Sequence, residues 1–357
     1  MAPSADPRPI TDNPTEHTSS AVAADGADGG LERLHDAFSD DLTLVNQLIV
    51  ERMQSPVALI PQLAGYIVAA GGKRLRPLLT LASAKLCGYQ GDRHYGLATC
   101  VEFIHTATLL HDDVFDESLA RRGQASANAE FGNQASVLVG DFLFTRAFQL
   151  MIADGSLEVL DVLCRASATI AEGEVMQLIT TNDLETDEAK YLEVIEGKTA
   201  VLFAAACQVG AMVAHRPAEE VEALRVFGEN LGMAFQLIDD ILDYSADRRS
   251  WGKQIGDDFR EGKMTLPVVL ALAAADRGDH QDERAFWERT IGRQEQTDAD
   301  LEQALTLMAR HGSLDLARER AQRYAQSAVA ALAPFDKTEA TYNLLVDAVM
   351  ASVQRQR

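Results

Sequence analysis

The sequence predicts an all-α protein, on three observations. From residue 31 onward apolar residues recur every three or four positions, as in LVNQLIVERM and LRVFGENLGMAFQLI, which is the spacing of one helix face. Segments with strand-like alternation are nearly absent. Proline and glycine interrupt the pattern only at intervals, at Pro56, Gly71, Gly72, Gly88, Gly155, Pro217 and Pro267. We therefore expect residues 31–357 to form one domain of about a dozen helices.

The first thirty residues differ from the rest of the chain. Residues 1–30 are rich in Pro, Asp, Ser, Thr, Ala and Gly and carry no apolar period. This composition predicts a disordered tail, to which we assign no role. The whole chain has 357 residues and 47% hydrophobic content, enough for a large core.

The charge balance excludes two classes of partner. The chain has 54 acidic and 32 basic residues, a net charge of −22. Sequence-independent binding to nucleic acid and to anionic lipid both require an excess of Lys and Arg. We expect a protein that binds neither, although a local basic pocket could still hold an anionic ligand.

Cysteine usage and apolar runs predict a cytoplasmic protein. Cys87, Cys100, Cys164 and Cys207 lie far apart with no CxxC spacing, which favours reduced thiols over disulfides or a zinc site. No stretch reaches the ~18 uninterrupted apolar residues of a membrane span. The N-terminus lacks the charged-then-apolar layout of a signal peptide.

Two aspartate clusters share one pattern. LHDDVFD (110–116) and LIDDILD (237–243) each close an apolar helix. Asp112 and Asp116 are four residues apart and point the same way, as do Asp239 and Asp243. Such carboxylates repel unless a cation lies between them, and oxygen-only donors suit Mg²⁺. A solvated acidic helix end explains one cluster, whereas two copies favour a metal site whose halves face each other.

Four basic motifs offer counter-charges for an anion bound with the metal. Each alone is also explained as a solvated face, so only their combination indicates a phosphate site. Arginine matches phosphate oxygens bidentately and lysine acts as a compact charge. The motifs are GGKRLRP with Lys73, Arg74 and Arg76, RRG with Arg121 and Arg122, GKTA with Lys198 and Thr199, and GKQIGDDFREGK with Lys253 and Lys263.

The helix of the first cluster has two further features. His105 lies two turns before Asp112 on the same face, either as a core residue or as part of the anion site. Ala107 and Thr108 are small and leave space beneath the aspartates. A metal, several phosphate anchors and an apolar tunnel together imply a substrate with a diphosphate head and a hydrocarbon tail.

These motifs together resemble those of the trans-polyprenyl diphosphate synthases, specifically the long-chain bacterial enzymes that make quinone side chains. The resemblance extends from about residue 40 to the C-terminus and includes GGKRLRPLL, FIHTATLLHDDVFDESLARRG, AEGEVMQL, AFQLIDDILDY and GKQIGDDFREGKMTLP. It implies an all-α isoprenoid synthase bundle around a deep central cavity. It also implies a homodimer and transient membrane contact for product release.

The resemblance implies a role for each site residue. Mg²⁺ ligands would be Asp112, Asp116 and Asp239, with Asp113, Asp240 and Asp243 in support and Asp258 acting through water. Isopentenyl diphosphate would contact Lys73, Arg76, His105 and Arg122. The allylic diphosphate would contact Arg121, Lys198 and Lys253, with Thr199, Gln236 and Lys263 nearby. Three Mg²⁺ ions per site are implied, with Mn²⁺ as a substitute.

The implied reaction is chain elongation. An allylic primer, farnesyl or geranylgeranyl diphosphate, ionises; the isopentenyl double bond attacks head to tail; a proton is lost. The small Ala107 and Thr108 predict an octaprenyl to decaprenyl product. Three alternatives compete with this hypothesis: a class I terpene cyclase or squalene-type synthase, a regulatory subunit of a heteromeric synthase, and an acidic metal-buffering or scaffold protein.

Overall fold

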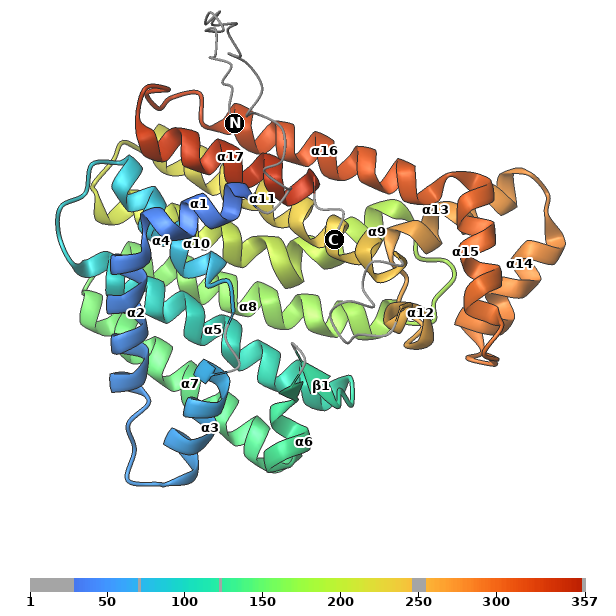
Figure 1. Ribbon diagram of the computed structural model, residues 1–357, viewed down its shortest axis with the longest axis horizontal. Helices are drawn as coiled ribbons and strands as arrows, with labels where there is room; N and C mark the ends of the chain where they lie inside the picture. The colour runs from blue at the N-terminus through green and yellow to red at the C-terminus, as the bar shows by residue number, and fades with distance from the viewer. Residues whose placement is uncertain (1–28, 70–71, 122–123, 246–254, 355–357) are drawn as a thin grey trace, which may run out of the picture.

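The computed structural model describes residues 29–69, 72–121, 124–245 and 255–354 (Figure 1). The all-α prediction is confirmed, because helices make up almost all of the regular structure in these ranges. The first helix begins at Gly29, so the last two residues of the predicted tail are helical. Residues 1–28 lie outside the described residues and their predicted disorder stays a prediction.

Among the described residues, the N-terminal half holds eight helices and one small hairpin. Their bounds are α1 Gly29–Ala37, α2 Ser39–Arg52, α3 Leu59–Ala69, α4 Leu75–Leu86, α5 Arg93–Phe115, β1 Ala120–Arg121, β2 Gln124–Ala125, α6 Ala127–Phe131, α7 Asn133–Asp154 and α8 Leu157–Thr180. Strands β1 and β2 pair antiparallel.

The C-terminal half adds the remaining helices, including two π-helical turns named η1 and η3. Their bounds are α9 Glu188–Ile195, η1 Glu196–Ala200, α10 Val201–Val213, α11 Ala218–Asp243, α12 Asp257–Arg260, α13 Leu266–Arg277, α14 Gln281–Trp287, η3 Glu288–Gly292, α15 Asp300–His311, α16 Ser313–Ala331 and α17 Ala340–Gln354.

Helix boundaries follow local chemistry. Gly155 ends α7 in the left-handed conformation, with φ of 80°, and the Ser156 Oγ then accepts a hydrogen bond from Val159 N at 3.2 Å to cap α8. Pro217 precedes α11, and Pro267 lies in the first turn of α13, where its missing N–H costs nothing. These three predicted interruptions are confirmed.

The long helices run alongside one another, and α13 to α15 gather at one end (Figure 1). Helix α10 contacts both α5 and α11, while α7 packs along α5 and α16 along α11. Helices α5 and α11 carry the two aspartate clusters at their C-terminal ends. Their packing around α10 therefore determines how the clusters face each other.

Two glycines permit the close helix contacts that shape this region. A Cβ on Gly232 of α11 would lie 2.7 Å from Ala200 Cα, and a Cβ on Gly173 of α8 would lie 2.6 Å from Lys198 N. Both distances are well inside van der Waals contact. Only glycine therefore allows α11 and α8 to approach the η1 turn this closely.

Within the described part of the chain, two helical stretches are long and apolar enough to cross a membrane by length and composition alone, Asn133–Asp154 and Glu188–Val213. In the apolar windows of these stretches, 44% and 78% of the residues are buried, respectively. A buried core helix passes the same test, so the finding is weak evidence for a membrane span.

Candidate active site

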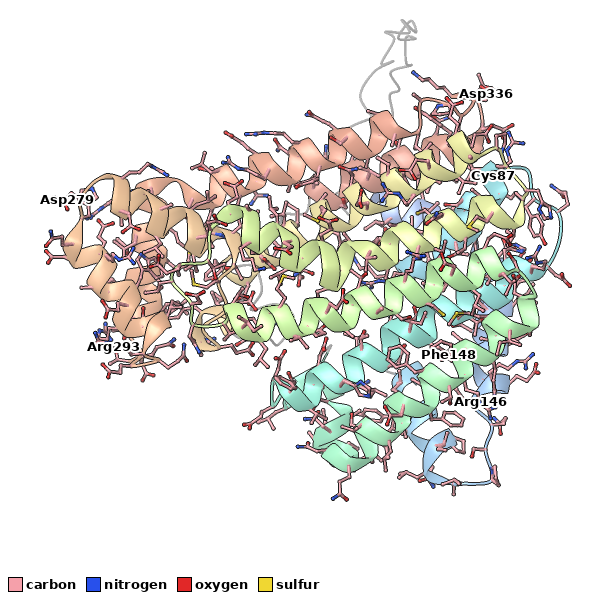
Figure 2. The ribbon with its side chains drawn as sticks, turned by 180° about the vertical axis from the view of Figure 1, so that it is seen from behind. Cys87, Arg146, Phe148, Asp279, Arg293 and Asp336 are labelled. Carbon is pink, nitrogen blue, oxygen red and sulfur yellow. The ribbon has the colours of Figure 1, made fainter. Side chains whose placement is uncertain are left out.

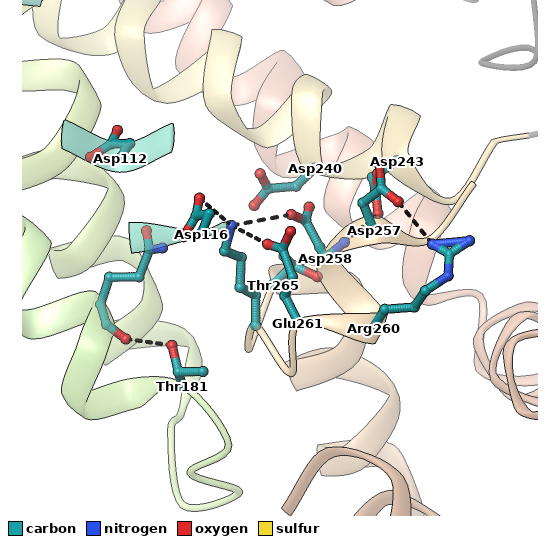
Figure 3. Close-up of polar contacts among 12 residues, drawn as sticks. Asp112, Asp116, Thr181, Asp240, Asp243, Asp257, Asp258, Arg260, Glu261 and Thr265 are labelled. Carbon is teal, nitrogen blue, oxygen red and sulfur yellow. Dashed lines mark hydrogen bonds and ion pairs between the residues drawn. The ribbon is translucent and has the colours of Figure 1, made fainter. Parts of the chain in front are cut away.

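Both aspartate clusters line one cavity of about 620 Å³. Asp112 and Asp116 reach it from α5, and Asp239 and Asp243 reach it from the facing helix α11. Figure 3 shows Asp112 and Asp116 on one side and Asp243 on the other. The repeated sequence pattern thus corresponds to two carboxylate groups across one space, as expected.

Two lysines lie between these carboxylates. The Nζ of Lys198 is 2.6 Å from Glu174 Oε2 and 3.7 Å from Asp112 Oδ2. The Nζ of Lys263 is 3.2 Å from Asp116 Oδ2 and 2.5 Å from Glu261 Oε2. Each ammonium group offsets part of the repulsion among the acidic side chains.

The position of Lys198 depends on a local departure from α-helical geometry. Lys198 lies in the π-helical turn η1, which widens the backbone between α9 and α10. Such turns are rare and are frequent at functional sites. Gly173 lets the α8 backbone pass directly against Lys198. Together these features direct the ammonium group towards Asp112 of α5.

A chain of hydrogen bonds fixes the middle aspartate of the second cluster. Tyr191 Oη donates to Asp240 Oδ2 at 2.5 Å, and Gln236 Nε2 donates to Asp240 Oδ1 at 2.8 Å. Thr199 Oγ1 donates to Gln236 Oε1 at 3.0 Å. Burial raises the pKa of Asp240 to about 7, while the bonds from Tyr191 and Gln236 oppose that rise.

The turn at α12 adds a further carboxylate to the lining of the cavity. Asp258 lines the cavity, and its backbone N–H donates to Asp243 Oδ2 at 3.0 Å. Burial, followed by the charges of Asp243 and Asp240, holds the pKa of Asp258 well above its usual range. Burial likewise raises the pKa of Glu174 to about 7, against the lowering effect of Lys198. Asp240 and Asp258 both line the cavity, and desolvated carboxylates there favour a cationic ligand.

None of the described residues of GGKRLRP lines this cavity. Arg76 Nη1 is 3.1 Å from His105 Nε2, and its guanidinium lies 4.4 Å above the centroid of the Phe203 ring. Arg74 forms a buried ion pair with Glu102. Arg76 and His105 therefore lie side by side, but neither lines the cavity of the aspartate clusters, and their role in binding an anion stays a prediction.

Lys73 and Asp113 occupy different surroundings. Lys73 lines a separate cavity of about 370 Å³ next to α1, with His35 and Asp36. Asp113 is buried, and its carbonyl oxygen accepts a bond from Asn128 Nδ2 at 3.0 Å. The structure therefore does not bring Lys73 into the cavity of the aspartate clusters.

Three predicted site residues cannot be placed. Arg122 and Lys253 lie outside the described residues, and so does the side chain of Arg121, whose backbone belongs to β1. Their predicted roles in binding the two diphosphates stay predictions.

A second, apolar cavity of about 590 Å³ opens beside the first. Asp112, Asp116 and Lys263 line both cavities, so the two spaces meet at the first cluster. Thr108 and Phe144 are among the residues that line the apolar one. An anionic head at the aspartates and a hydrocarbon tail in the apolar cavity would be accommodated together.

The two residues predicted to control chain length are placed differently. Thr108 lines the apolar cavity, and its Oγ1 donates back to His105 O at 2.8 Å. Ala107 is fully buried in the core and does not line that cavity.

The carboxylates fit a metal that is bound together with phosphate. Among the described residues, no three His, Cys, Asp or Glu side chains are grouped to hold a metal ion alone. Mg²⁺ commonly takes one or two carboxylates and completes its shell with water and substrate phosphates. Two pairs of oxygen donors on facing helices supply that kind of partial ligand set.

Sequence reasoning missed two residues of the site. Glu174 pairs with Lys198, and Tyr191 bonds Asp240. Glu174 lies within the motif AEGEVMQL, which had no assigned role, and Tyr191 lies seven residues before Lys198. Both contacts join segments far apart in the chain, so no local spacing indicates them.

Comparisons with known proteins agree with this geometry. The sequence profile described as polyprenyl synthetase matches residues 57–308. The chain is 47% identical over 327 residues to octaprenyl diphosphate synthase of Escherichia coli (strain K12), covering 92% of this chain and 99% of that protein.

Two solved structures are also similar. A decaprenyl diphosphate synthase from Rhodobacter capsulatus has a TM-score of 0.87 at 49% identity, covering 92% of this chain and 99% of that one. A polyprenyl synthase from Caulobacter crescentus CB15, complexed with calcium and isoprenyl diphosphate, has a TM-score of 0.86 at 51% identity, covering 92% and 98%.

Proposed function

This chain belongs to the polyprenyl synthetase family, and on that premise we propose that it extends an allylic prenyl diphosphate by repeated head-to-tail condensation with isopentenyl diphosphate. The product is a long-chain all-trans polyprenyl diphosphate of octaprenyl to decaprenyl length, used for a quinone side chain. The observation that carries the proposal is the junction of the acidic cavity with the apolar cavity at Asp112 and Asp116.

The reaction depends on a divalent metal, Mg²⁺ in this proposal, with Mn²⁺ as a substitute. Asp112 and Asp116 would hold it from one side and Asp239 from the other, with Asp258 behind them. When bound, the metal neutralises charge that develops on the departing diphosphate. Calcium in the Caulobacter crescentus structure supports a hard divalent cation.

The chain's own cations would bind the allylic diphosphate at the cavity mouth. Lys198 and Lys263 already lie between carboxylates, so their ammonium groups are oriented before substrate arrives. Preoriented charge stabilises a transition state without reorganisation at the moment of reaction. The hydrogen bond from Thr199 Oγ1 to Gln236 Oε1 holds the residue that directly follows Lys198 and so helps to position Lys198.

Isopentenyl diphosphate would bind at Arg76 and at His105, which lies two helical turns before Asp112 along α5. Arg76 Nη1 of α4 lies 3.1 Å from His105 Nε2 of α5, and this pairing of two nitrogen-bearing side chains supports a second position for an anion. Arg122 follows α5 in sequence and would complete this position, while the neighbouring Arg121 would contact the allylic diphosphate. Attack by the isopentenyl double bond on the ionised allylic carbon then forms the new carbon–carbon bond, and the departing diphosphate takes the proton released.

The apolar cavity would hold the growing chain and exclude water. A dry, apolar wall protects a carbocation from hydrolysis. Thr108 lines this cavity and is small, which supports a long product. The buried Ala107 would act on chain length only through its packing.

We further propose that the enzyme is a cytoplasmic homodimer joined through α7 and α8. Leu138, Phe148 and Ile152 of α7 and Leu178 and Ile179 of α8 are exposed. Figure 2 shows Phe148 on the outer side of α7. Exposed apolar residues on two helices that contact each other support an interaction surface here.

The test is a product assay. Purified protein is incubated with radiolabelled isopentenyl diphosphate, farnesyl or geranylgeranyl diphosphate and Mg²⁺, and the products are resolved by chain length. The proposal expects a long polyprenyl diphosphate that is lost when a chelator removes the metal. A terpene cyclase would release hydrocarbon or alcohol from the allylic substrate alone, and a regulatory subunit would show no turnover without a partner.

A further inference from the structure

Three loops meet at the turn that carries Lys263. They follow α8, α12 and η3 and contribute Asn182, Gly262 and Gln294. All three residues have left-handed backbones, with φ of 63°, 71° and 57° respectively. This conformation is uncommon for residues with side chains and persists where surrounding contacts enforce it. Three such residues in contact indicate a specifically built junction.

The junction is held by direct hydrogen bonds. Asn182 N donates to Gly262 O at 2.9 Å, and Gln294 Nε2 donates to Asn182 Oδ1 at 2.9 Å. A Cβ on Gly262 would lie 1.8 Å from Asn182 Oδ1 and 2.3 Å from Gln294 Nε2. The two amide side chains therefore lie flat against the Gly262 backbone, with no room for a side chain there.

The loop that supplies Gln294 is itself anchored. Gln296 Nε2 donates to Phe259 O at 2.9 Å, which ties this loop to α12. Arg289 Nη2 and Asp300 Oδ1 lie 2.6 Å apart and hold the base of the loop. On the opposite side, Asp258 N bonds Asp243 Oδ2. The α12 turn is thus fixed to the second aspartate cluster and to the C-terminal helices.

We propose that Asn182 and Gln294 are positioning residues that hold the Gly262 turn so that the Lys263 ammonium faces Asp116. This inference rests on the proposed function, in which Lys263 and Asp116 receive the allylic diphosphate. Lys263 directly follows Gly262, and its Nζ lies 3.2 Å from Asp116 Oδ2. Rotation of the Gly262 peptide would move the Lys263 side chain with it. We call the contacts of Asn182 and Gln294 with Gly262 the clamp. Without the clamp, the Lys263 ammonium group would occupy several positions and diphosphate binding would weaken.

Two variants at position 182 separate the contribution of the Asn182 side chain from that of its left-handed backbone conformation. Asn182→Gly accepts the left-handed backbone and removes the carboxamide, whereas Asn182→Asp keeps an oxygen that can accept from Gln294. We expect Asn182→Gly to raise the KM for the allylic diphosphate about tenfold, with the KM for isopentenyl diphosphate unchanged and the melting temperature near that of the wild type. Asn182→Asp is expected to restore the wild-type KM. An equal rise in both KM values would contradict a role through Lys263.

A double-mutant cycle tests the route of the effect. If Asn182 acts through Lys263, Asn182→Gly adds no further loss when Lys263→Ala is already present. Fully additive losses would overturn the proposal. The matched control is Asn343→Ala on α17, which also removes side-chain amide bonds but whose bonds go to Lys337 O and Glu339 O rather than to the Gly262 turn; both KM values are expected to stay unchanged.

A binding measurement keeps the test independent of turnover. The affinity of inorganic pyrophosphate with Mg²⁺, measured by calorimetry, is expected to fall about tenfold in Asn182→Gly and to show the same non-additivity with Lys263→Ala. Wild-type protein that binds pyrophosphate yet makes no polyprenyl product would contradict the proposed function alone. Unchanged pyrophosphate affinity in Asn182→Gly would contradict the clamp alone.

Discussion

Replacing Gly232 by alanine tests whether the approach of α11 to the η1 turn organises the active site. The added Cβ would lie 2.7 Å from Ala200 Cα and 3.1 Å from the Cβ atoms of Ala200 and Phe203. Carbon atoms in contact prefer separations of about 3.5 Å or more, so α11 would have to shift by about 0.8 Å. The neighbours are one Cα and two Cβ atoms, whose positions are fixed by the backbone, so no side-chain rotation can relieve the contact.

The expected cost follows from the packing. Overpacking a close helix contact costs about 1–3 kcal/mol, while exchanging glycine for alanine inside a helix gains up to about 1 kcal/mol. A shift of about 0.8 Å would also stretch the 3.0 Å bond between Thr199 and Gln236 beyond hydrogen-bond range. Loss of that bond frees Gln236 from its place beside Asp240, so activity should fall as well as stability.

Gly96→Ala is the matched control, because Gly96 lies in α5 and has nothing within 4 Å of its ideal Cβ. Both variants gain the same helix propensity, so the difference between their free energies of unfolding reports the clash alone, about 1–3 kcal/mol. Denaturant unfolding and initial rates measure the two effects. We expect Gly96→Ala to be at least as stable as the wild type and fully active. The reasoning fails if Gly232→Ala matches Gly96→Ala in both measurements.

Three further outcomes are expected. Asp112→Asn and Asp239→Asn should each lower kcat by about 10²–10³ with folding intact by circular dichroism, since each removes a carboxylate that would hold the divalent metal against the diphosphate; retention of full activity in either would remove that residue from the metal site. Thr108→Phe should shorten the product in the radiolabel assay, because an aromatic ring would fill part of the 590 Å³ cavity. Burial raises the pKa of Asp240 to about 7, so the stability this group contributes is present below its unfolded pKa and is lost as pH rises through about 7. With a chelator present, the melting temperature should fall between pH 5 and pH 8, and it should fall by less in Asp240→Asn than in the wild type. A difference in melting temperature between these two proteins that does not change with pH would contradict this assignment.

The sequence made the helices and the aspartate clusters predictable because both depend on spacing along one element. The i, i+4 relation of Asp112 to Asp116 follows from helix geometry alone. Breaks at Gly155, Pro217 and Pro267 follow from backbone chemistry and appear where expected. The repeat of the aspartate pattern predicted that the two clusters face each other, and both line one cavity.

The contacts between distant segments could not be predicted. Lys198 forms an ion pair with Glu174 of another helix, and Tyr191 donates a hydrogen bond to Asp240, which lies 49 residues away in the sequence. Lys73 lines a cavity beside α1, which its motif did not indicate. Pairings of this kind depend on helix rotation and helix separation, which local sequence does not specify.

The sequence by itself determined the secondary structure and the residues that bear charge, because periodicity, capping and side-chain chemistry are local properties. Only the tertiary structure decided which carboxylates are buried, which lysines lie between them and which loops support Lys263. The reason is physical: burial and pairing depend on how closely α5, α8 and α11 approach one another around η1 and α10. Those distances are set by the packing of all the contacting helices together, including contacts as small as the one at Gly232.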